Sequence, residues 1–350
     1  MTHHGSDYYM SAKVISVRTN GTEMLNGQNL KGYYLPLGAT NIMTTGHEYD
    51  DAFVVWDWTR VPGTTAVANQ STADLRWYLF GSNQFGGGVS NAHNGVMAYE
   101  HAYQGVEARK AYFFMGDAMV CMGSGIKAAR TQEVRTSVNQ CLANGEVTYG
   151  LSGHIYRLTN DLSDKNIDWA YHDNVGYIFP QNESVTLRKA KQTGAWRELE
   201  VTASDKPVTK EIFSLWVSHG TTPQHEDYCY IIMPDKPLSY FTDKKFENEI
   251  KIIVNSEQIQ AISNENKRQY AAVFYEPGEI RFAEDLVVAV NKKVIIYIEK
   301  KDKQYEIAVA DPLYKEQFLQ LSMNGEQINI VFPSGDYSGS SVIKHITEKH

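Results

Sequence analysis

The segment Leu319-Gln320-Leu321-Ser322-Met323-Asn324-Gly325-Glu326-Gln327-Ile328-Asn329-Ile330-Val331 decides the fold class of this chain. Apolar and polar residues alternate on both sides of Asn324-Gly325, and this alternation is typical of half-buried β-strands. An Asn-Gly pair favours a two-residue turn between antiparallel strands, because both residues accept positive φ angles. The segment therefore predicts a β-hairpin.

The same pattern recurs over most of the chain. Short runs of β-branched and aromatic residues are separated by glycine, asparagine, aspartate and proline, whereas long amphipathic stripes with helix caps are missing. We therefore expect an almost wholly β protein. Representative runs are residues 111–114, 134–138, 213–217 and 228–232, and further Asn-Gly turns are expected at Asn20-Gly21, Asn26-Gly27, Asn94-Gly95 and Asn144-Gly145.

A shift in composition predicts two domains. Pro234-Asp235-Lys236-Pro237 leads into the charged segment 243–247, and tryptophan is absent after Trp216. Strands beyond this point are flanked by lysine and glutamate, while glycine, histidine and tryptophan are denser before it. We expect a larger β domain over residues 1–245, which is the better place to look for a sugar site, and a smaller β-sandwich over residues 246–350.

Composition excludes several classes of protein. The 350 residues are 42% hydrophobic and 21% charged, as in an ordinary folded protein, and the net charge of −8 argues against nucleic acid as a partner. No apolar run approaches membrane-spanning length, and the first residues lack the pattern of a signal peptide. Cys121, Cys141 and Cys229 have no zinc-binding spacing; one bridge between Cys121 and Cys141 or three buried thiols are the alternatives, and thiols are favoured.

Residues 46–65 carry the most suggestive chemistry in the chain. Gly46-His47-Glu48-Tyr49-Asp50-Asp51 is rich in carboxylates, and Val54-Val55-Trp56-Asp57-Trp58-Thr59-Arg60-Val61-Pro62-Gly63 follows at once. Indole faces cover the apolar faces of sugar rings, and an arginine fork pairs with carboxylate or sulfate. The segment therefore fits a protein that holds a sugar chain bearing carboxylates, although a buried strand ending in a turn also explains its valines.

Each candidate residue has a plainer alternative. Glu48 is either a charge-setting group in a cleft or a solvated loop acid. Trp56 and Trp58 are expected on one face of a strand, where they form either a sugar platform or part of the core. Arg60 lies near a strand end, where binding groups often occur. A metal is not favoured, because His47 and Glu48 would point to opposite faces, and no motif demands a cofactor.

Several blocks of sequence resemble the polysaccharide lyases of family 8, which include chondroitin AC, chondroitin ABC, hyaluronate and xanthan lyases. The combination of Glu48-Tyr49 with Trp56-Asp57-Trp58 is most similar to the chondroitin-type enzymes. The blocks occur in order over most of the chain, at residues 26–34, 48–65, 86–90, 108–114, 120–126, 136–141, 172–177, 194–197, 219–220 and 228–234.

The resemblance implies a large antiparallel β-supersandwich, then a small C-terminal β-sandwich, with a helical toroid on the N-terminal side. It also implies β-elimination at a uronic acid of an anionic glycosaminoglycan of the chondroitin or hyaluronan type, outside the cytoplasm (secreted or periplasmic). The family's asparagine, histidine, tyrosine and arginine for proton transfer belong to the toroid, and no block here matches them; His3 and His4 do not replace the histidine. Glu48 matches a glutamate that the sandwich contributes to the catalytic cleft.

The expectation is therefore the C-terminal β part of a lyase, with Glu48 as its catalytic contribution and Arg60, Trp56 and Trp58 on one cleft wall. Alone, the chain should have little or no lyase activity, because the toroid is its expected partner. The rival interpretations are a non-catalytic carbohydrate-binding module and a purely structural β-sandwich.

Overall fold

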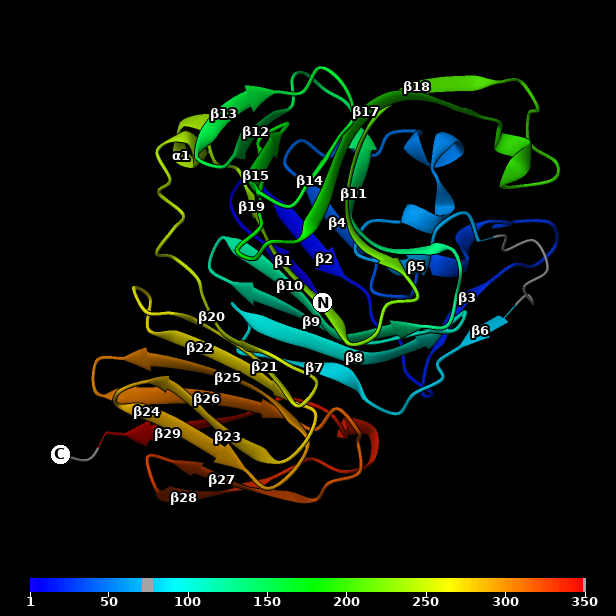
Figure 1. The fold of residues 1–350 in the computed structure, drawn as a ribbon. Helices are drawn as coiled ribbons and strands as arrows, with labels where there is room; N and C mark the ends of the chain where they lie inside the picture. Colours follow the sequence, from blue (N-terminus) through cyan, green and yellow to red (C-terminus); the bar gives the residue numbers. More distant parts are fainter. Residues whose placement is uncertain (71–77, 349–350) are drawn as a thin grey trace.

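The computed structural model describes residues 1–70 and 78–348, and Figure 1 shows their arrangement as four stacked layers of strands. Every strand pairs with its neighbours in antiparallel fashion, as the ladders between β8, β9, β10 and β19 illustrate. The described part contains one short α-helix, α1 (Leu238–Thr242), and five single 3₁₀ turns. The prediction of an all-β fold is confirmed.

The larger part is built on a nine-stranded sheet and a five-stranded sheet, with two small sheets beside them. The nine-stranded order is β13 (His154–Arg157), β12 (Thr148–Leu151), β15 (Ile167–His172), β16 (Val175–Ile178), β19 (Glu226–Pro234), β10 (Ala118–Ala128), β9 (Val106–Met115), β8 (Gly95–Tyr103), β7 (Gly86–Ser90). The five-stranded order is β14 (Leu162–Asp164), β17 (Ser184–Gly194), β18 (Val208–Thr221), β11 (Glu133–Leu142), β5 (Thr65–Val67). One small sheet has three strands, in the order β1 (Thr2–His4), β2 (Tyr9–Ala12), β4 (Thr40–Met43), and the other pairs β3 (Asn20–Glu23) with β6 (Tyr78–Phe80). The 3₁₀ turns are η1 (Gly32–Tyr34), η2 (Ala52–Val55), η3 (Trp58–Arg60), η4 (Trp196–Glu198) and η5 (Gly335–Tyr337).

The smaller part is a sandwich of a six-stranded and a four-stranded sheet. The six-stranded order is β20 (Lys251–Asn255), β21 (Ile259–Asn264), β22 (Gln269–Phe274), β25 (Val294–Lys301), β26 (Gln304–Ala310), β29 (Val342–Thr347). The four-stranded order is β23 (Gly278–Ala283), β24 (Leu286–Val290), β27 (Phe318–Met323), β28 (Glu326–Val331).

The hairpin expected at Asn324-Gly325 is confirmed, because β27 pairs with β28 from Met323↔Glu326 to Phe318↔Val331. Asn324 has a φ of 52° and Gly325 a φ of 84°, both in the left-handed region that a tight hairpin turn requires. The runs at 111–114, 134–138, 213–217 and 228–232 all lie in strands. The turn expected at Asn20-Gly21 is wrong, because both residues lie inside β3.

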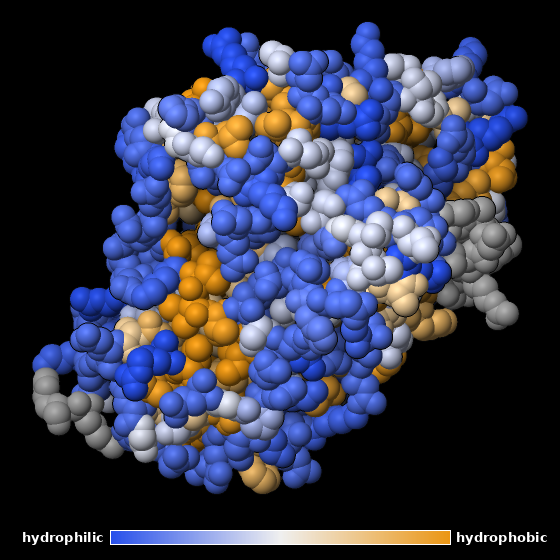
Figure 2. All heavy atoms as spheres, in the orientation of Figure 1, coloured by the Kyte–Doolittle hydropathy of each residue, from blue (hydrophilic) through white to orange (hydrophobic). Residues whose placement is uncertain are grey.

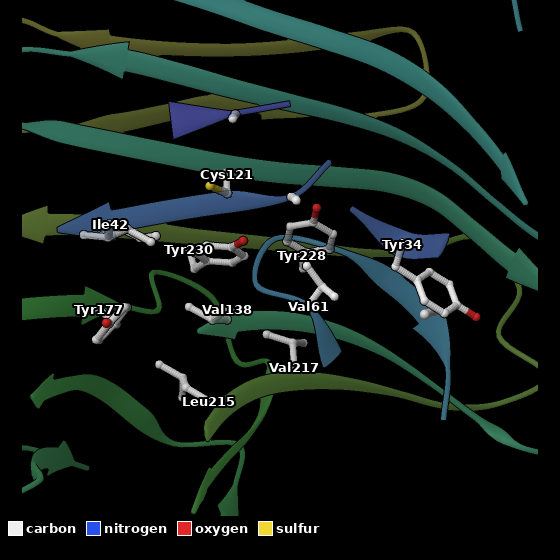
Figure 3. Packing of buried hydrophobic residues seen from close by; sticks show 14 of the residues in the cluster. Tyr34, Ile42, Val61, Cys121, Val138, Tyr177, Leu215, Val217, Tyr228 and Tyr230 are labelled. Carbon is white, nitrogen blue, oxygen red and sulfur yellow. The ribbon is translucent and has the colours of Figure 1, made fainter. Parts of the chain in front are cut away.

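The nine-stranded sheet is covered on both faces, which explains the continuous apolar run of β9. Tyr112 and Phe114 belong to the core facing the five-stranded sheet, whereas Phe113 and Met115 belong to the core facing the smaller part. Figure 3 shows the first of these cores, where Tyr228 and Tyr230 approach side chains of β11 and β18. Each fully buried large apolar side chain contributes about 1.5–3 kcal/mol to folding.

The larger and the smaller part share a hydrophobic core and are not connected by a linker alone. Ile262 and Val273 of the six-stranded sheet pack in one cluster with Val120 and Ile231 of the nine-stranded sheet. The connecting helix α1 is itself anchored, because Phe241 is fully buried in that cluster. The boundary near residue 245 stays a prediction.

Most of the molecular surface seen in Figure 2 is hydrophilic, with hydrophobic atoms concentrated in a band between the two parts on this face. This distribution fits the shared core, since the margin of that core reaches the surface. None of the helices in the described residues is long and apolar enough to cross a membrane.

Replacing Gly325 by alanine should lower the free energy of unfolding by about 1 kcal/mol, because a left-handed conformation is unfavourable for a residue with a Cβ atom. A Cβ at this position would meet no atom of the described residues within 4 Å, so the cost is purely conformational. Urea unfolding measures it. Gly325→Asn is the matched control, since asparagine tolerates this region better; an equal loss in both variants would contradict the conformational explanation.

Candidate functional site

Glu48 lies in a turn directly after β4, and its carboxylate is held by backbone amides of that turn. Oε1 accepts hydrogen bonds from the backbone N–H groups of Thr44 (2.8 Å) and Thr45 (2.7 Å), and Oε2 accepts one from Gly46 (3.0 Å). Gly46 has a φ of 86°, which lets the chain turn so that these amides converge. The hydroxyls of Thr44 and Thr45 also donate to Oε1, at 3.1 and 3.0 Å. The side chain thus sits in an anion-binding nest.

This surrounding keeps Glu48 ionised. Burial alone would raise the pKa of Glu48, which is 3% exposed, but the amide and hydroxyl donors outweigh burial and lower the pKa below its ordinary value. Oε1 has four donors and Oε2 has one. A carboxylate oxygen can accept from more than one donor, so Oε2 retains capacity for a further partner. Such a group can orient another side chain, but it is a poor proton donor.

The next residue ties the turn to the five-stranded sheet. Tyr49 is buried, donates its hydroxyl hydrogen to Oδ1 of Asn139 on β11 (3.0 Å), and accepts from the backbone N–H of Ile42 (3.3 Å). The carbonyl of Glu48 accepts from the N–H of Leu142, also on β11 (2.9 Å). These contacts fix the position of Glu48 along β11. Asn139, on which the anchor depends, was not among the predicted site residues.

The prediction that Trp56 and Trp58 share one face of a strand is wrong. Trp56 ends the 3₁₀ turn η2 and Trp58 begins η3, because the Asp57 side chain accepts from Thr59 and caps the second turn. The indoles nevertheless meet edge to face, with ring centroids 5.6 Å apart. Trp56 is 6% exposed and therefore part of the core, whereas Trp58 is half-buried.

Phe53 extends this aromatic cluster to the surface. It is 37% exposed, its ring centroid lies 4.7 Å from that of Trp56, and its carbonyl accepts from Nε1 of Trp58 (3.2 Å). Tyr49 contacts Trp56 from the other side, with ring centroids 6.1 Å apart. The aromatic surface is therefore made by Phe53 and Trp58, and Trp56 joins both rings to Tyr49, the neighbour of Glu48 in sequence. Sequence reasoning missed Phe53, since a strand pattern gave no reason to expose it.

Arg60 is placed near Trp56 and Trp58 but is already engaged. Its Nε donates to Oδ2 of Asp57 at 2.8 Å, and its guanidinium lies 4.6 Å from the ring centroid of Trp216. It is 6% exposed; burial lowers its pKa, and the Asp57 carboxylate partly offsets that shift. Burial raises the pKa of Asp57, but Arg60 and Thr59 together lower it below its ordinary value. Contact of Arg60 with a ligand stays a prediction, and its immediate role is to hold η3.

The remaining histidines, acids and cysteines are dispersed. Glu100 and His101 line one cavity of about 250 Å³, whereas His93 lines another. Cys121, Cys141 and Cys229 are buried free thiols, so the Cys121–Cys141 bridge is not formed. His47 pairs with Asp50 at 2.7 Å on the surface. Among residues 1–70 and 78–348, no group of three or more His, Cys, Asp or Glu side chains could hold a metal.

Lys110 is a buried charge that sequence reasoning also missed. It is fully buried on β9, its Nζ donates to the carbonyl of Gly63 (2.7 Å), and it lies 5.9 Å from the rings of Tyr112 and Tyr228. Burial lowers its pKa to about 7. The alternation of β9, which puts position 110 on the face of Ala108 and Tyr112, was the signal that could have found it.

Stacked antiparallel sheets and two cores on a doubly covered sheet define the class of β-supersandwich proteins with an attached β-sandwich. The family comparisons make the identification specific. Residues 1–245 match the super-sandwich domain of polysaccharide lyase family 8, and residues 251–320 match its C-terminal β-sandwich domain. The chain therefore belongs to polysaccharide lyase family 8.

Curated relatives support the same assignment. A chondroitinase-AC from Pedobacter heparinus is 32% identical over 348 residues, which cover 96% of this chain and 49% of that protein. A hyaluronate lyase from Staphylococcus aureus is 26% identical over 89% of this chain and 39% of its own length. The chain spans about half the length, or less, of these relatives.

Solved structures agree with the fold. A chondroitinase AC lyase studied in complex with oligosaccharides has a TM-score of 0.92 and 30% identity, and the match covers 98% of this chain and 52% of that one. A xanthan lyase from Paenibacillus has a TM-score of 0.89 at 20% identity, over 100% of this chain and 36% of that one. The second likeness concerns the fold alone.

Proposed function

We propose that this chain is the C-terminal β part of a lyase that cleaves a uronate-containing glycosaminoglycan of the chondroitin or hyaluronan type. The observation that carries the proposal is the Glu48 carboxylate, held ionised by the amides of residues 44–46 in the segment that also contributes the aromatic surface of Phe53 and Trp58. The 32% identity to a chondroitinase-AC supports the choice of substrate class. A secreted or periplasmic location belongs to the proposal and rests on the resemblance alone.

The proposed chemistry is β-elimination. A base removes the proton at C5 of the uronate, the electrons of that C–H bond form the C4–C5 double bond, and the 4-O-glycosidic oxygen leaves with a proton. Glu48 is neither the base nor the acid in this scheme, because its donors stabilise the ionised form. Its free capacity at Oε2 would accept from a cationic or phenolic donor of the N-terminal helical toroid, and so fix that donor's position.

Phe53 and Trp58 would form the wall of the cleft next to Glu48, where their exposed ring surface can cover a sugar ring. Trp56 supports that wall from the core, and Arg60 supports it through Asp57 and Trp216. Trp56 and Arg60 were expected to contact substrate; in this proposal they support the residues that do.

The assay of unsaturated uronate by its ultraviolet absorbance tests the proposal. The full-length protein from the same open reading frame should release unsaturated product from chondroitin or hyaluronan, whereas residues 1–350 alone should release none above background. Clear turnover by the 350-residue chain would refute the shared-cleft proposal. A full-length protein that binds these polymers without cleaving them would favour the non-catalytic binding module instead.

A further inference from the structure

A polar cavity of about 250 Å³ is lined by residues at the start of β17 and the end of β18 in the five-stranded sheet and at the start of β19 in the nine-stranded sheet. It is lined by Glu183 before β17, Ser218 at the end of β18, and Asp227 on β19, among other residues. Ser184 and Ser218 face each other in register, and Glu133 pairs with Thr221 at the same end of β11. Glu48 is anchored at the Leu142 end of β11, whereas Ser218 lies opposite Arg135, so the two sites are about 23 Å apart by strand length.

The cavity carries an unbalanced negative charge. Three carboxylates line it, those of Glu183, Glu226 and Asp227, together with one exposed amine, that of Lys165. Within the described part of the chain, none of the three carboxylates is within 4.0 Å of a lysine, arginine or histidine nitrogen, and Lys165 forms no ion pair either. His219 adds no charge, because burial lowers its pKa to about 3. When all of these groups are ionised, three acids and one base leave a net charge of −2.

Glu183 is the most unusual member of this set. It is 8% exposed, its Oε1 accepts from the backbone N–H of Cys229 (2.9 Å), and its Oε2 is buried without any hydrogen-bond partner in the described structure. Burial, with a smaller contribution from the nearby Asp227, raises its pKa to about 7, although backbone N–H groups, that of Cys229 first among them, act in the opposite direction. Burial and Glu226 raise the pKa of Asp227 as well. A buried carboxyl oxygen without a donor is costly, so a ligand that supplies a donor and a positive charge would stabilise it.

The shape of the site favours an organic cation over a metal ion. The acids are not arranged so that three His, Cys, Asp or Glu side chains of the described chain could share a metal. The cavity is also several times larger than the roughly 30 Å³ that one water molecule occupies in the liquid. The remaining lining groups, Gln181, Asn182, Ser184 and Ser218, provide amide and hydroxyl groups that suit a polar organic molecule.

We propose that this cavity binds an organic ammonium group, with Glu183 as its buried anchor and Asp227 and Glu226 at its mouth. The ammonium group could come from an amino sugar with a free amine or from a lysine side chain of a peptide. This inference does not depend on the proposed lyase reaction, because it concerns side chains at the other end of β11 from Glu48.

Isothermal titration calorimetry of the 350-residue chain at pH 7 tests the proposal with three probes: glucosamine, N-acetylglucosamine and Nα-acetyl-lysine amide. At least one of the two amines should bind, and N-acetylglucosamine, which lacks the charge, should bind at least tenfold more weakly than glucosamine or not at all. Preference for glucosamine would identify an amino-sugar site, and preference for the lysine derivative a peptide site.

Glu183→Gln should lower the amine affinity at least tenfold while keeping an oxygen that can accept from Cys229. Asp227→Asn should lower the amine affinity about threefold. Because Asp227 is exposed, this variant should fold normally and so tests the site even if Glu183→Gln misfolds. Glu279→Gln is the matched control, since Glu279 is an exposed strand carboxylate of the smaller part and should leave binding unchanged. Equal binding of glucosamine and N-acetylglucosamine, no effect of Glu183→Gln, or Glu183-dependent binding of Ca²⁺ without amine binding would each overturn the proposal.

Discussion

Replacing Glu48 by glutamine in the full-length protein is expected to slow the release of unsaturated uronate about 100-fold, with kcat falling more than KM rises. The reason is positional. Glu48 is proposed to orient a donor across the cleft, and a displacement of about 1 Å at a catalytic group can cost this much in rate. Glutamine keeps the shape of the side chain, but its NH₂ group would face the amides of residues 44–46, which are donors themselves.

The matched control is Asp50→Asn in the same turn. Asp50 is an exposed carboxylate that pairs with His47 at the surface, so its loss should change kcat less than twofold. Circular dichroism and thermal unfolding of both variants separate a local effect from misfolding. A folded Glu48→Gln protein with the wild-type kcat would reject the proposed role and favour the structural β-sandwich interpretation.

Replacing Lys110 by methionine should raise the free energy of unfolding of the 350-residue chain at pH 7 by about 2 kcal/mol. A pKa lowered from 10.5 to about 7 corresponds to a destabilisation of about 5 kcal/mol at most. Methionine cannot donate to the Gly63 carbonyl, and the loss of that hydrogen bond offsets part of the expected gain in stability. Methionine has a similar length and fills irregular apolar space. The Tyr112 hydroxyl lies 2.9 Å from the Gly38 carbonyl oxygen and 3.3 Å from that of Gly63, so its single hydrogen only partly replaces the lysine donor at Gly63.

The stability difference between Lys110→Met and the wild-type chain should decrease as the pH rises. The folded-state pKa of Lys110 lies below its unfolded value, so between about pH 7 and pH 10.5 the unfolded chain binds more protons. The lysine therefore destabilises the fold fully below about pH 7, and this cost fades as the pH rises toward 10.5. Urea unfolding at pH 7 and pH 10 should show a smaller difference between Lys110→Met and wild type at the higher pH.

Lys206→Met is the control, because Lys206 is exposed in the η4–β18 connection and should change stability by less than about 0.5 kcal/mol at either pH. A Lys110→Met protein that is less stable than wild type by the same amount at both pH values would show that packing, and not the buried charge, dominates at this position.

Local pattern predicted the four strand runs and the C-terminal hairpin, but not the strand at Asn20-Gly21 or the geometry of the candidate site. The hairpin at Asn324-Gly325 follows from turn chemistry and period-two alternation, which neighbouring residues determine among themselves. Alternation misplaced Trp56 and Trp58, because capping by Asp57 made a 3₁₀ turn in which faces do not alternate. Ligand contact by Arg60 stays a prediction, but its contact with Trp216, which is far from it in sequence, could not be read from the local pattern.

By itself the sequence determined an antiparallel β protein with an acidic, aromatic segment at residues 46–65, since strand and turn preferences act over a few residues. The tertiary structure alone decided which groups are charged, buried or available. Stacking of sheets from distant segments buries Lys110 and Glu183, and the turn at residues 44–46 surrounds Glu48 with amides. Solvation and hydrogen bonding depend on every atom nearby in space, and no stretch of sequence contains that neighbourhood.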